Sequence, residues 1–404
     1  MLKQKEKTTL KNNSGSKKVQ TLTSEKSNSI KVFGFASLLN DLGANMIYPI
    51  WPLFLTSVLG ANMSILGLVD GLGDSLVSLS QALSGYLSDR LKKRKVFIWL
   101  GYLLGAISRL GYAFTTSWPM IIPYRILDRS GKIRDAPRDA IIADESNKTN
   151  RGNNFGLIKG MDKLGGVIGI ILCIFFANLI GYQTFFMLAA IPSLISVGLV
   201  YYYIKEKKNP QIKLYKGIKL SNLSKNYKLF LILSSIFALG SFSYSFLMVF
   251  ANKAGYEITL VPVFYLLYVV FAAVFSLPFG KLSDIIGRKN GMYIALILWA
   301  LTCVVFIFFN AWWAMPLTFI LYGLHHAALG PIQTTYVCEL APKKFKASAL
   351  GGFQMCIGLC ALPASIIAGI LWDTMGKTTP FILSLILTLI AVIILYFVKE
   401  NKKS

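Results

Sequence analysis

The residues best suited to chemistry are ionisable side chains set within long apolar segments. Asp41, Asn45 and Tyr48 follow the spacing i, i+4, i+7, and Asp70 and Asp74 lie four residues apart in the next apolar segment. Each set would therefore share one face of a helix. A buried carboxylate that alternates between water and a basic partner can bind and release a proton. Asp41 is the first choice for this role, whereas Asp70 and Asp74 lie among glycines and would alternatively support close helix packing.

Further polar residues occupy the apolar segments on both sides of the chain's midpoint. Arg125 is expected to be the counter-charge of a carboxylate or the ligand of an anionic solute. In the second half, His325 and His326 point about 100° apart on a helix, so one is expected to face a cavity and the other to pack. A hydrogen-bonded structural histidine is the equal alternative. The candidate ion-coupling or cavity residues are Asp41, Asn45, Tyr48, Asp70, Asp74, Arg109, Arg125, Asp162, His325, His326 and Gln354.

A second candidate region is the stretch Asp128–Glu145. It holds four bases and five acids, although only 15% of the chain is charged. Gly131 and Pro137 are expected to end regular helix there. So much charge of both signs requires contact with water or lipid headgroups, which places the stretch at the end of a membrane crossing.

The elements that position these residues must be membrane-spanning helices. The chain is 54% hydrophobic, its mean hydropathy is +0.57, and apolar runs long enough to cross a bilayer recur along it. We predict an all-α polytopic membrane protein in which twelve helices form two six-helix bundles. The expected helices cover residues 31–56, 65–88, 96–115, 118–137, 154–177, 183–204, 229–252, 259–282, 291–310, 312–336, 347–371 and 378–398.

Basic residues indicate the direction of these crossings. All but four of the 42 Lys and Arg residues fall in the two tails or in the connections on one side of the expected bundle. Basic residues mark the cytoplasmic side, so both termini are predicted to be cytoplasmic. The net charge of +24 then reflects topology and lipid contact, and no nucleic-acid partner is expected.

The same map divides the chain into segments. We expect a basic cytoplasmic tail over residues 1–30, a six-helix bundle over 31–204 and a basic cytoplasmic linker over 205–228. A second six-helix bundle over 229–398 and a short tail over 399–404 complete the chain.

Enzymatic, metal and cofactor chemistry is not indicated. The five cysteines lie in or beside apolar segments and are interpreted as buried free thiols. We find no convergent metal-ligand spacing, no phosphate-binding loop of the Gly-x-x-x-x-Gly-Lys-Ser/Thr type and no catalytic constellation. The sequence therefore predicts neither an enzyme nor a bound cofactor.

The chain contains an internal repeat. Gly85 and Asp89 match Gly280 and Asp284 at an offset of 195 residues, and the same offset carries Asp144 onto Glu339. One spacing that serves separate connections indicates a duplicated unit, which is typical of secondary transporters.

The repeated segments, GYLSDRLKKRK at 85–95 and GKLSDIIGRKN at 280–290, resemble the signature of the major facilitator superfamily. Lys92 and Ile285 depart from it, where a glycine and an arginine are usual. The stretches Asn40–Gly60, Asp128–Asp144 and Ala361–Asp373 resemble a prokaryotic branch whose substrates are mostly unassigned, with siderophore handling suggested for some members. Asn45 stands where that branch is expected to have a glutamate, so a solute or coupling ion different from the branch norm is an alternative.

The resemblance implies that Asp89 pairs across the interface between the halves when the cytoplasmic side is closed. Salt bridges between helix ends suit such a gate because they exchange for water at little net cost. The alternative is a solvated charged loop without a gating role. The gate candidates are Gly85, Asp89, Arg90, Arg94, Asp128, Arg129, Arg138, Asp144, Gly280, Asp284, Arg288 and Glu339.

The resemblance also implies a function. We expect a monomeric secondary transporter in the plasma membrane of a prokaryote, moving a small organic solute by alternating access with protons as the coupling ion. An uncoupled facilitator, a drug or metabolite exporter and a non-transporting membrane receptor remain alternatives.

The predicted orientation can be tested directly. A reporter fused after Ser404, or inserted near Pro210, should show cytoplasmic activity because basic residues mark that side. The two reporters should agree, since an even number of crossings separates the two sites. An extracytoplasmic signal from either reporter would contradict the helix count or the charge argument.

Overall fold

The structure, a computed structural model, describes residues 29–147, 150–206, 223–309, 311–342 and 346–400. Helices account for nearly all of this part of the chain, and none of these residues forms a β-strand, which confirms the all-α prediction. The expected tail over 1–30, most of the linker over 205–228 and most of the tail over 399–404 lie outside the described residues.

The first group of helices begins with a helix over residues 29–47. It is followed by the short α2 (Trp51–Leu53), a π-helical turn over Phe54–Val58 and the long α3 (Met63–Leu91). The rest of this group is α4 (Lys95–Ala113), α5 (Trp118–Ser130), a 3-10 turn over Gly131–Arg134, α6 (Asp135–Glu145), α7 (Arg151–Ile180) and α8 (Tyr182–Tyr203).

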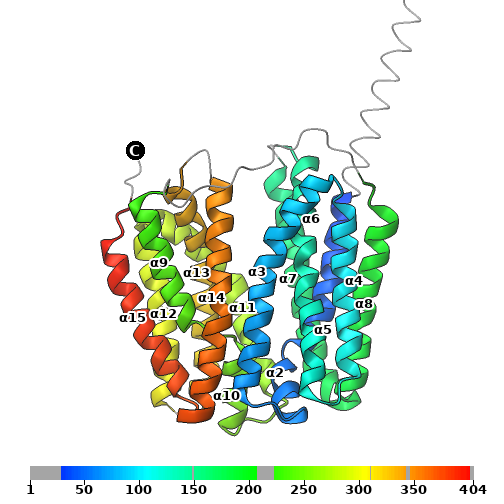
Figure 1. The fold of residues 1–404 in the computed structure, drawn as a ribbon. Helices are drawn as coiled ribbons and strands as arrows, with labels where there is room; N and C mark the ends of the chain where they lie inside the picture. The colour runs from blue at the N-terminus through cyan, green and yellow to red at the C-terminus, as the bar shows by residue number, and fades with distance from the viewer. Residues whose placement is uncertain (1–28, 148–149, 207–222, 310, 343–345, 401–404) are drawn as a thin grey trace, which may run out of the picture.

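The second group forms the other side of the molecule in Figure 1. It consists of α9 (Lys225–Gly240), α10 (Ser245–Lys253), α11 (Val261–Ile286), α12 (Arg288–Phe308), α13 (Ala314–Leu340), α14 (Lys346–Met375) and α15 (Thr379–Phe397). The two groups meet where α3 packs against α14 and α7 packs against α11.

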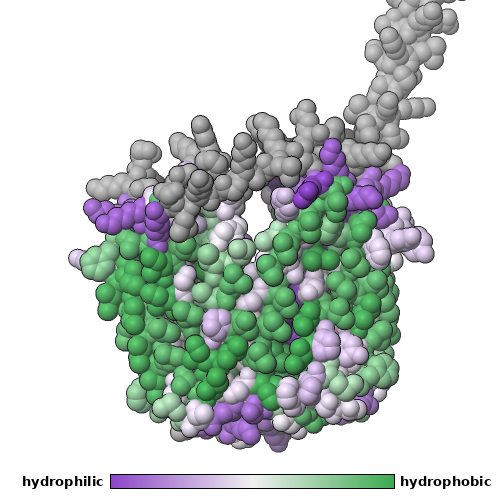
Figure 2. All heavy atoms as spheres, viewed as in Figure 1, coloured by the Kyte–Doolittle hydropathy of each residue, from purple (hydrophilic) through white to green (hydrophobic). Residues whose placement is uncertain are grey.

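Nine helices among the described residues are long and apolar enough to cross a membrane. The expected first, fourth and tenth crossings fall on residues 29–58, Trp118–Glu145 and Ala314–Leu340, which are also helical but are interrupted or carry more polar residues. The arrangement is consistent with twelve crossings. Figure 2 shows apolar side chains around the middle of the molecule and polar ones towards its two ends.

The two ends of the bundle differ in charge. We call the end formed by residues 90–95, 128–145 and 284–289 the basic end. The opposite end, formed by residues 59–62, 114–117, 254–260 and 376–378, is the far end. The long α3 runs from the far end to the basic end, and α14 runs in the reverse direction.

The fourth crossing differs from the prediction. Helical structure does not end near Pro137 but continues through the 3-10 turn and α6 to Glu145. The physical reason is position: Pro137 lies in the first turn of α6, where its missing N–H has no helical partner to lose. Gly131 does end regular α-helix, since α5 stops at Ser130 with Gly131 as its C-cap. It also permits close packing, because a Cβ there would lie 2.7 Å from the carbonyl oxygen of Gly101.

The first and seventh crossings are both broken, which the sequence pattern does not predict. Regular helix stops at residues 48–50 in the first and at 241–244 in the seventh. Pro52 follows the first break and has no N–H to donate to the Tyr48 carbonyl oxygen, so the helical hydrogen-bond pattern is interrupted there. At the second break, the Ser243 hydroxyl accepts a hydrogen bond from the Ser245 N–H at 3.3 Å and so competes with the helical pattern.

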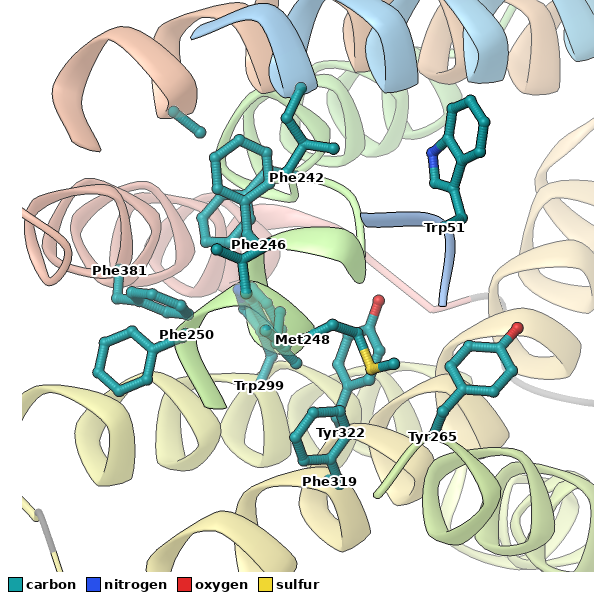
Figure 3. Close-up of a cluster of buried hydrophobic side chains, with 14 of the residues drawn as sticks. Trp51, Phe242, Phe246, Met248, Phe250, Tyr265, Trp299, Phe319, Tyr322 and Phe381 are labelled. Atoms are coloured by element: carbon teal, nitrogen blue, oxygen red, sulfur yellow. The ribbon is translucent and has the colours of Figure 1, made fainter. Parts of the chain in front are cut away.

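The interior between the groups is filled in two ways. An aromatic cluster runs from Trp51 to Phe242, Trp299 and Phe381, as Figure 3 shows. Where α3 and α14 cross, the two backbones come into contact through glycines instead. A Cβ on Gly67 would lie 2.0 Å from the Ser365 carbonyl oxygen. Small residues of this kind let membrane helices approach closely.

Gly369→Ala should destabilise the protein, because the new Cβ would lie 2.3 Å from the Met63 carbonyl oxygen and 2.7 Å from the Ser64 Cα, both backbone atoms of α3. We expect a loss of about 1–3 kcal/mol, measured as a lower melting temperature in detergent. Gly351→Ala, on the same helix, has no neighbour within 4 Å of the new Cβ and should be neutral or slightly stabilising. Equal effects from the two substitutions would contradict the close-packing argument.

Candidate functional site

A cavity lies between the two groups of helices. Its volume is about 390 Å³, which is in the range of small-molecule sites. Its wall is formed by residues of α3, the turn after α5, α9, α13 and α14: Asp74, Val77, Ser78, Arg129, Lys132, Ser234, Phe237, Ala238, Ser241, Leu329, Gln333, Ile357, Gly358 and Ala361.

The cavity continues towards the basic end. A second chamber of about 280 Å³ shares Ser78 with the first and includes Gln81, Asp135, Asp139 and Gln354. Gln81 and Gln354 lie further along α3 and α14 in the direction of the basic end, and Asp135 and Asp139 lie on α6 at that end. Figure 2 shows a gap between the two groups at that end of the molecule. The cavity is therefore open towards the basic end.

Contacts between the groups close the far end. Asp373 of α14 accepts hydrogen bonds from the backbone N–H groups of Met63 and Ser64, at 3.1 and 2.7 Å, and from the Ser64 hydroxyl at 2.6 Å. A carboxylate at the N-terminus of α3 is also favoured by the helix dipole. Nearer the middle, the Tyr244 hydroxyl donates to the Tyr48 carbonyl oxygen at 3.2 Å, so the two broken helices contact each other.

Asp70 forms a fully buried ion pair with Arg125. The Arg125 Nη2 lies 2.5 Å from Asp70 Oδ1, and the Trp51 indole N–H donates to the same oxygen at 3.0 Å. The guanidinium also lies over the Trp51 ring, 4.3 Å from its centroid. From the other group, the Ser243 hydroxyl donates to Asp70 Oδ2 at 2.8 Å. The Asp70 carboxylate thus connects both groups of helices. The Arg125 guanidinium is already paired with it.

Asp74, one helical turn further along α3, lies in different surroundings. Its side chain lines the cavity and is 45% exposed, and its Oδ1 is 3.9 Å from Arg129 Nη2, too far for a hydrogen bond. Arg129 itself is only 8% exposed. The cavity wall therefore carries a carboxylate and a guanidinium that face each other without direct contact.

The remaining first-half candidates form a separate cluster within the first group. Asp41 Oδ1 accepts from the Asn40 amide at 3.0 Å, and the Asn45 amide donates to the Asp41 carbonyl oxygen at 2.9 Å. Arg109 donates to Asn40 at 3.2 Å. Asp162 lies 3.9 Å from the Lys159 ammonium and is close enough to Asp41 for electrostatic interaction. None of these side chains belongs to the cavity wall described above.

The two histidines have different environments. His325 is buried, and its Nδ1 lies 2.8 Å from the Ala295 carbonyl oxygen, with Trp299 against the ring. His326 is exposed and its ring contacts Tyr268 and Tyr322. The pair therefore has one packed and one accessible member.

At the basic end, Arg94 connects two acids of the first group. Its guanidinium is 3.0 Å from Asp89 and 2.6 Å from Asp144. Partial burial opposes the charge, but the hydrogen bonds to Asp144 and Asp89 outweigh it and raise the pKa of Arg94 above its usual value. Glu206, at the end of the sixth crossing, accepts from the backbone N–H groups of Arg94 and Lys95 at 2.8 and 2.9 Å.

The second group repeats this arrangement. Arg288 forms ion pairs with Asp284 and, at 3.1 Å, with Glu339, while Glu400 accepts from the backbone N–H of Arg288. Arg94 and Glu206 correspond to Arg288 and Glu400 at an offset of 194. Sequence reasoning missed Glu206 and Glu400. A comparison of the two repeats that allows a shift of one residue from the 195-residue offset is the signal that could have found them. Each cluster lies within one group of helices in this structure.

The other gate candidates are spread over the basic end. Arg90 is exposed, and a Cβ on Gly85 would lie 3.5 Å from Ala136, whereas Gly280 has open space around it. Asp128 lies 3.9 Å from Arg125 and 3.8 Å from Arg129, deeper in the protein. Arg138 donates to the Ser37 hydroxyl at 2.7 Å and is 3.2 Å from Asp139.

Metal ligation finds no support in the described part of the chain, where no group of three or more His, Cys, Asp or Glu side chains converges. The five cysteines are free thiols. Cys173 and Cys303 are buried as expected, whereas Cys338, Cys356 and Cys360 are partly exposed.

Comparison with known proteins identifies the family. The family model of the Major Facilitator Superfamily matches residues 33–271 and 231–404. An uncharacterized MFS-type transporter of Methanocaldococcus jannaschii is 38% identical over 390 residues, which cover 93% of this chain and 96% of that protein. An uncharacterized transporter of Bacillus subtilis is 22% identical over 76% of this chain and 78% of its own.

Solved structures show the same fold. A POT family transporter in complex with a thioalcohol-conjugated peptide superposes with a TM-score of 0.76 at 13% identity, covering 92% of this chain and 95% of that chain. A mutant of the nucleoside transporter NupG superposes with a TM-score of 0.72 at 16% identity, covering 91% and 98%. With its sequence, its helical architecture and its relatives in agreement, the chain belongs to the major facilitator superfamily of membrane transporters.

Proposed function

We propose that this protein is a secondary transporter that moves a small organic solute by alternating access and couples this movement to protons. The observation that carries the proposal is the cavity between the two groups of helices, open towards the basic end and closed at the far end. Because basic residues mark the cytoplasmic side of a membrane protein, we expect the basic end to face the cytoplasm. The structure would then correspond to the state that exchanges solute with the cytoplasm.

Interactions at the two ends support an exchange between two states. At the far end, Asp373 bridges the groups through hydrogen bonds that must break for that end to open. At the basic end, Asp89 forms an ion pair with Arg94 of its own group of helices. Closure of the basic end would bring Asp89 to the interface between the groups. There it would pair with the second group of helices, as the family resemblance implies.

Proton coupling requires a carboxylate that gains and loses a basic partner. We favour Asp74 over Asp41 for this role, because Asp74 lines the cavity and faces Arg129 without contacting it. Asp70 is less suited, since its two oxygens accept hydrogen bonds from Arg125, Trp51 and Ser243. Breaking such a buried network costs several kcal/mol, on the order of 3–5.

Flux measurements separate this proposal from its alternatives. Purified protein in liposomes should accumulate its solute when a pH gradient is imposed, and should stop doing so when a protonophore is added. Solute equilibration that ignores the gradient would instead indicate an uncoupled facilitator. Binding without any flux would indicate a receptor and would refute the transport proposal.

Asp373→Asn should shift the protein towards the state that is open at the far end. The substitution removes the charge that accepts from Met63 N–H and Ser64, worth about 1.5–3 kcal/mol for a charge-assisted hydrogen bond. Spin labels at Thr116 and Ala254, on opposite groups at the far end, should report a larger population of long distances. Glu257→Gln removes an exposed far-end acid that contacts Thr259 of its own group, and should leave the distances unchanged.

Asp89→Asn should shift the equilibrium in the opposite sense at the basic end. The lost charge would no longer stabilise the closed basic end, and an exposed pair contributes at most about 1 kcal/mol, so expression and folding should be near normal. Labels at Lys93 and Asn290 should show a smaller population of short distances, with slower transport. Wild-type distances together with wild-type transport would remove Asp89 from the gate.

A further inference from the structure

The cavity wall contains a guanidinium whose hydrogen-bonding capacity is largely unused. Arg129 is 8% exposed, and its Nε has no hydrogen-bond partner among the residues that the structure describes. Its Nη1 reaches the Tyr48 hydroxyl only at 3.5 Å, and its nearest carboxylate oxygens, on Asp128 and Asp74, are 3.8 and 3.9 Å away. A guanidinium has five N–H donors, and leaving them unpaired in a buried site is costly.

Arg125, one turn earlier on α5, has a direct carboxylate partner, although its Nε, like that of Arg129, has no hydrogen-bond partner among the described residues. It forms a direct 2.5 Å pair with Asp70 and stacks on Trp51. Among the described residues no carboxylate approaches Arg129 as closely. Its guanidinium lies over the Tyr48 ring, 5.2 Å from the centroid, and borders the cavity. The difference between the two arginines indicates that the partner of Arg129 comes from the cavity itself.

The surroundings of Arg129 fit an anion with a neutral, partly polar body. Lys132, which also lines the cavity, adds a second positive charge. The opposite wall, from α9 and α13, is formed by Ser234, Ser241, Gln333 and apolar residues. The Ser234 hydroxyl is buried and has no hydrogen-bond partner in the described part of the chain, so this wall also offers a donor to a ligand.

We propose that the transported solute carries an anionic oxygen group, a carboxylate or a phosphate, and that Arg129 binds it. This inference rests on the proposed transport function. A planar guanidinium fork matches two oxygens of such a group, and charge-assisted bidentate pairs are stronger than neutral hydrogen bonds. Arg129, with Lys132 beside it, forms the anion subsite, and the wall from α9 and α13 contacts the rest of the solute.

Asp74 then couples the anion to a proton. Its carboxylate faces the same guanidinium across 3.9 Å, so an incoming oxyanion meets a negative charge unless Asp74 is protonated. A proton on Asp74 and an anion on Arg129 therefore favour each other's binding. Asp70 lies one turn away on the same helix. The groups on neighbouring elements that interact electrostatically with Asp74 are Arg125, Arg129, Tyr268 and Tyr322.

Binding is tested on the purified full-length protein in an uncharged detergent. Thermal stabilisation is compared between benzoate, succinate and phenyl phosphate and their uncharged counterparts benzamide, succinamide and phenol. At least one acid should stabilise the protein more than its counterpart, and Arg129→Gln should weaken that binding roughly 10- to 100-fold. Arg129→Lys, which keeps the charge but not the fork, should be intermediate. Lys281→Gln removes an exposed surface charge and controls for a general loss of positive charge.

The pH dependence tests the role of Asp74. In the wild type, binding of the acid should strengthen as pH falls from about 8 to about 5.5, because protonation of Asp74 removes the competing charge. Asp74→Asn should bind the acid tightly at both pH values. His326, whose ring contacts Tyr268 and Tyr322, is a second titratable side chain and serves as the comparison. A pH dependence that persists in Asp74→Asn but disappears in His326→Gln would overturn the role of Asp74.

Other outcomes distinguish the inference from the transport proposal. If no acid exceeds its uncharged counterpart while a neutral solute is accumulated in liposomes, the anion subsite is wrong and the transport function stands. Stabilisation by phosphatidylglycerol alone, with none of the acids, would identify a lipid headgroup and also overturn the inference. Acid binding that depends on Arg129 without any flux would support the subsite and refute transport.

Discussion

A carboxylate buried in a low-dielectric interior must be paired, and much of this structure depends on how Asp70 meets that requirement. Arg125 and Trp51 supply donors from the first group of helices, and Ser243 supplies one from the second. Ser243 can reach Asp70 because the seventh crossing is broken at that level. The corresponding break in the first crossing brings the Tyr48 carbonyl oxygen to the Tyr244 hydroxyl. Irregular backbone inside a membrane protein is tolerated where other protein groups satisfy it.

The duplicated unit gives the molecule two similar sets of charges at the basic end. In each set an arginine bridges two acids, and a glutamate from the last crossing of the group accepts from the backbone at the start of the third. These charges are partly exposed, so their pairing contributes little to stability and can change between states. Asp373 acts at the other end, where it joins the groups directly. Rigid groups with replaceable contacts at both ends are what alternating access requires.

The two groups differ in chemistry although they share a fold. The described intramembrane carboxylates and guanidiniums lie in the first group, whereas the second contributes hydroxyl, amide and aromatic side chains to the interior. The cavity therefore has one charged wall and one neutral wall. Such an asymmetric site would orient a solute that has one ionic end, because only one side of the cavity compensates that charge.

The sequence by itself determined the helical membrane class, the repeat and the set of ionisable residues, because hydropathy, basic-residue bias and the 195-residue offset are properties of the chain alone. It also identified a set of charged residues at the ends of helices: Asp89, Asp144, Asp284 and Glu339. Tertiary structure decided which charges meet. Asp70 and Asp74 share a helix face, yet packing buries the first against Arg125 and leaves the second in the cavity before Arg129. Other contacts depend on partners more than a hundred residues away in the chain, as for Asp373, Glu206 and Glu400. No local sequence pattern encodes contacts at such separations.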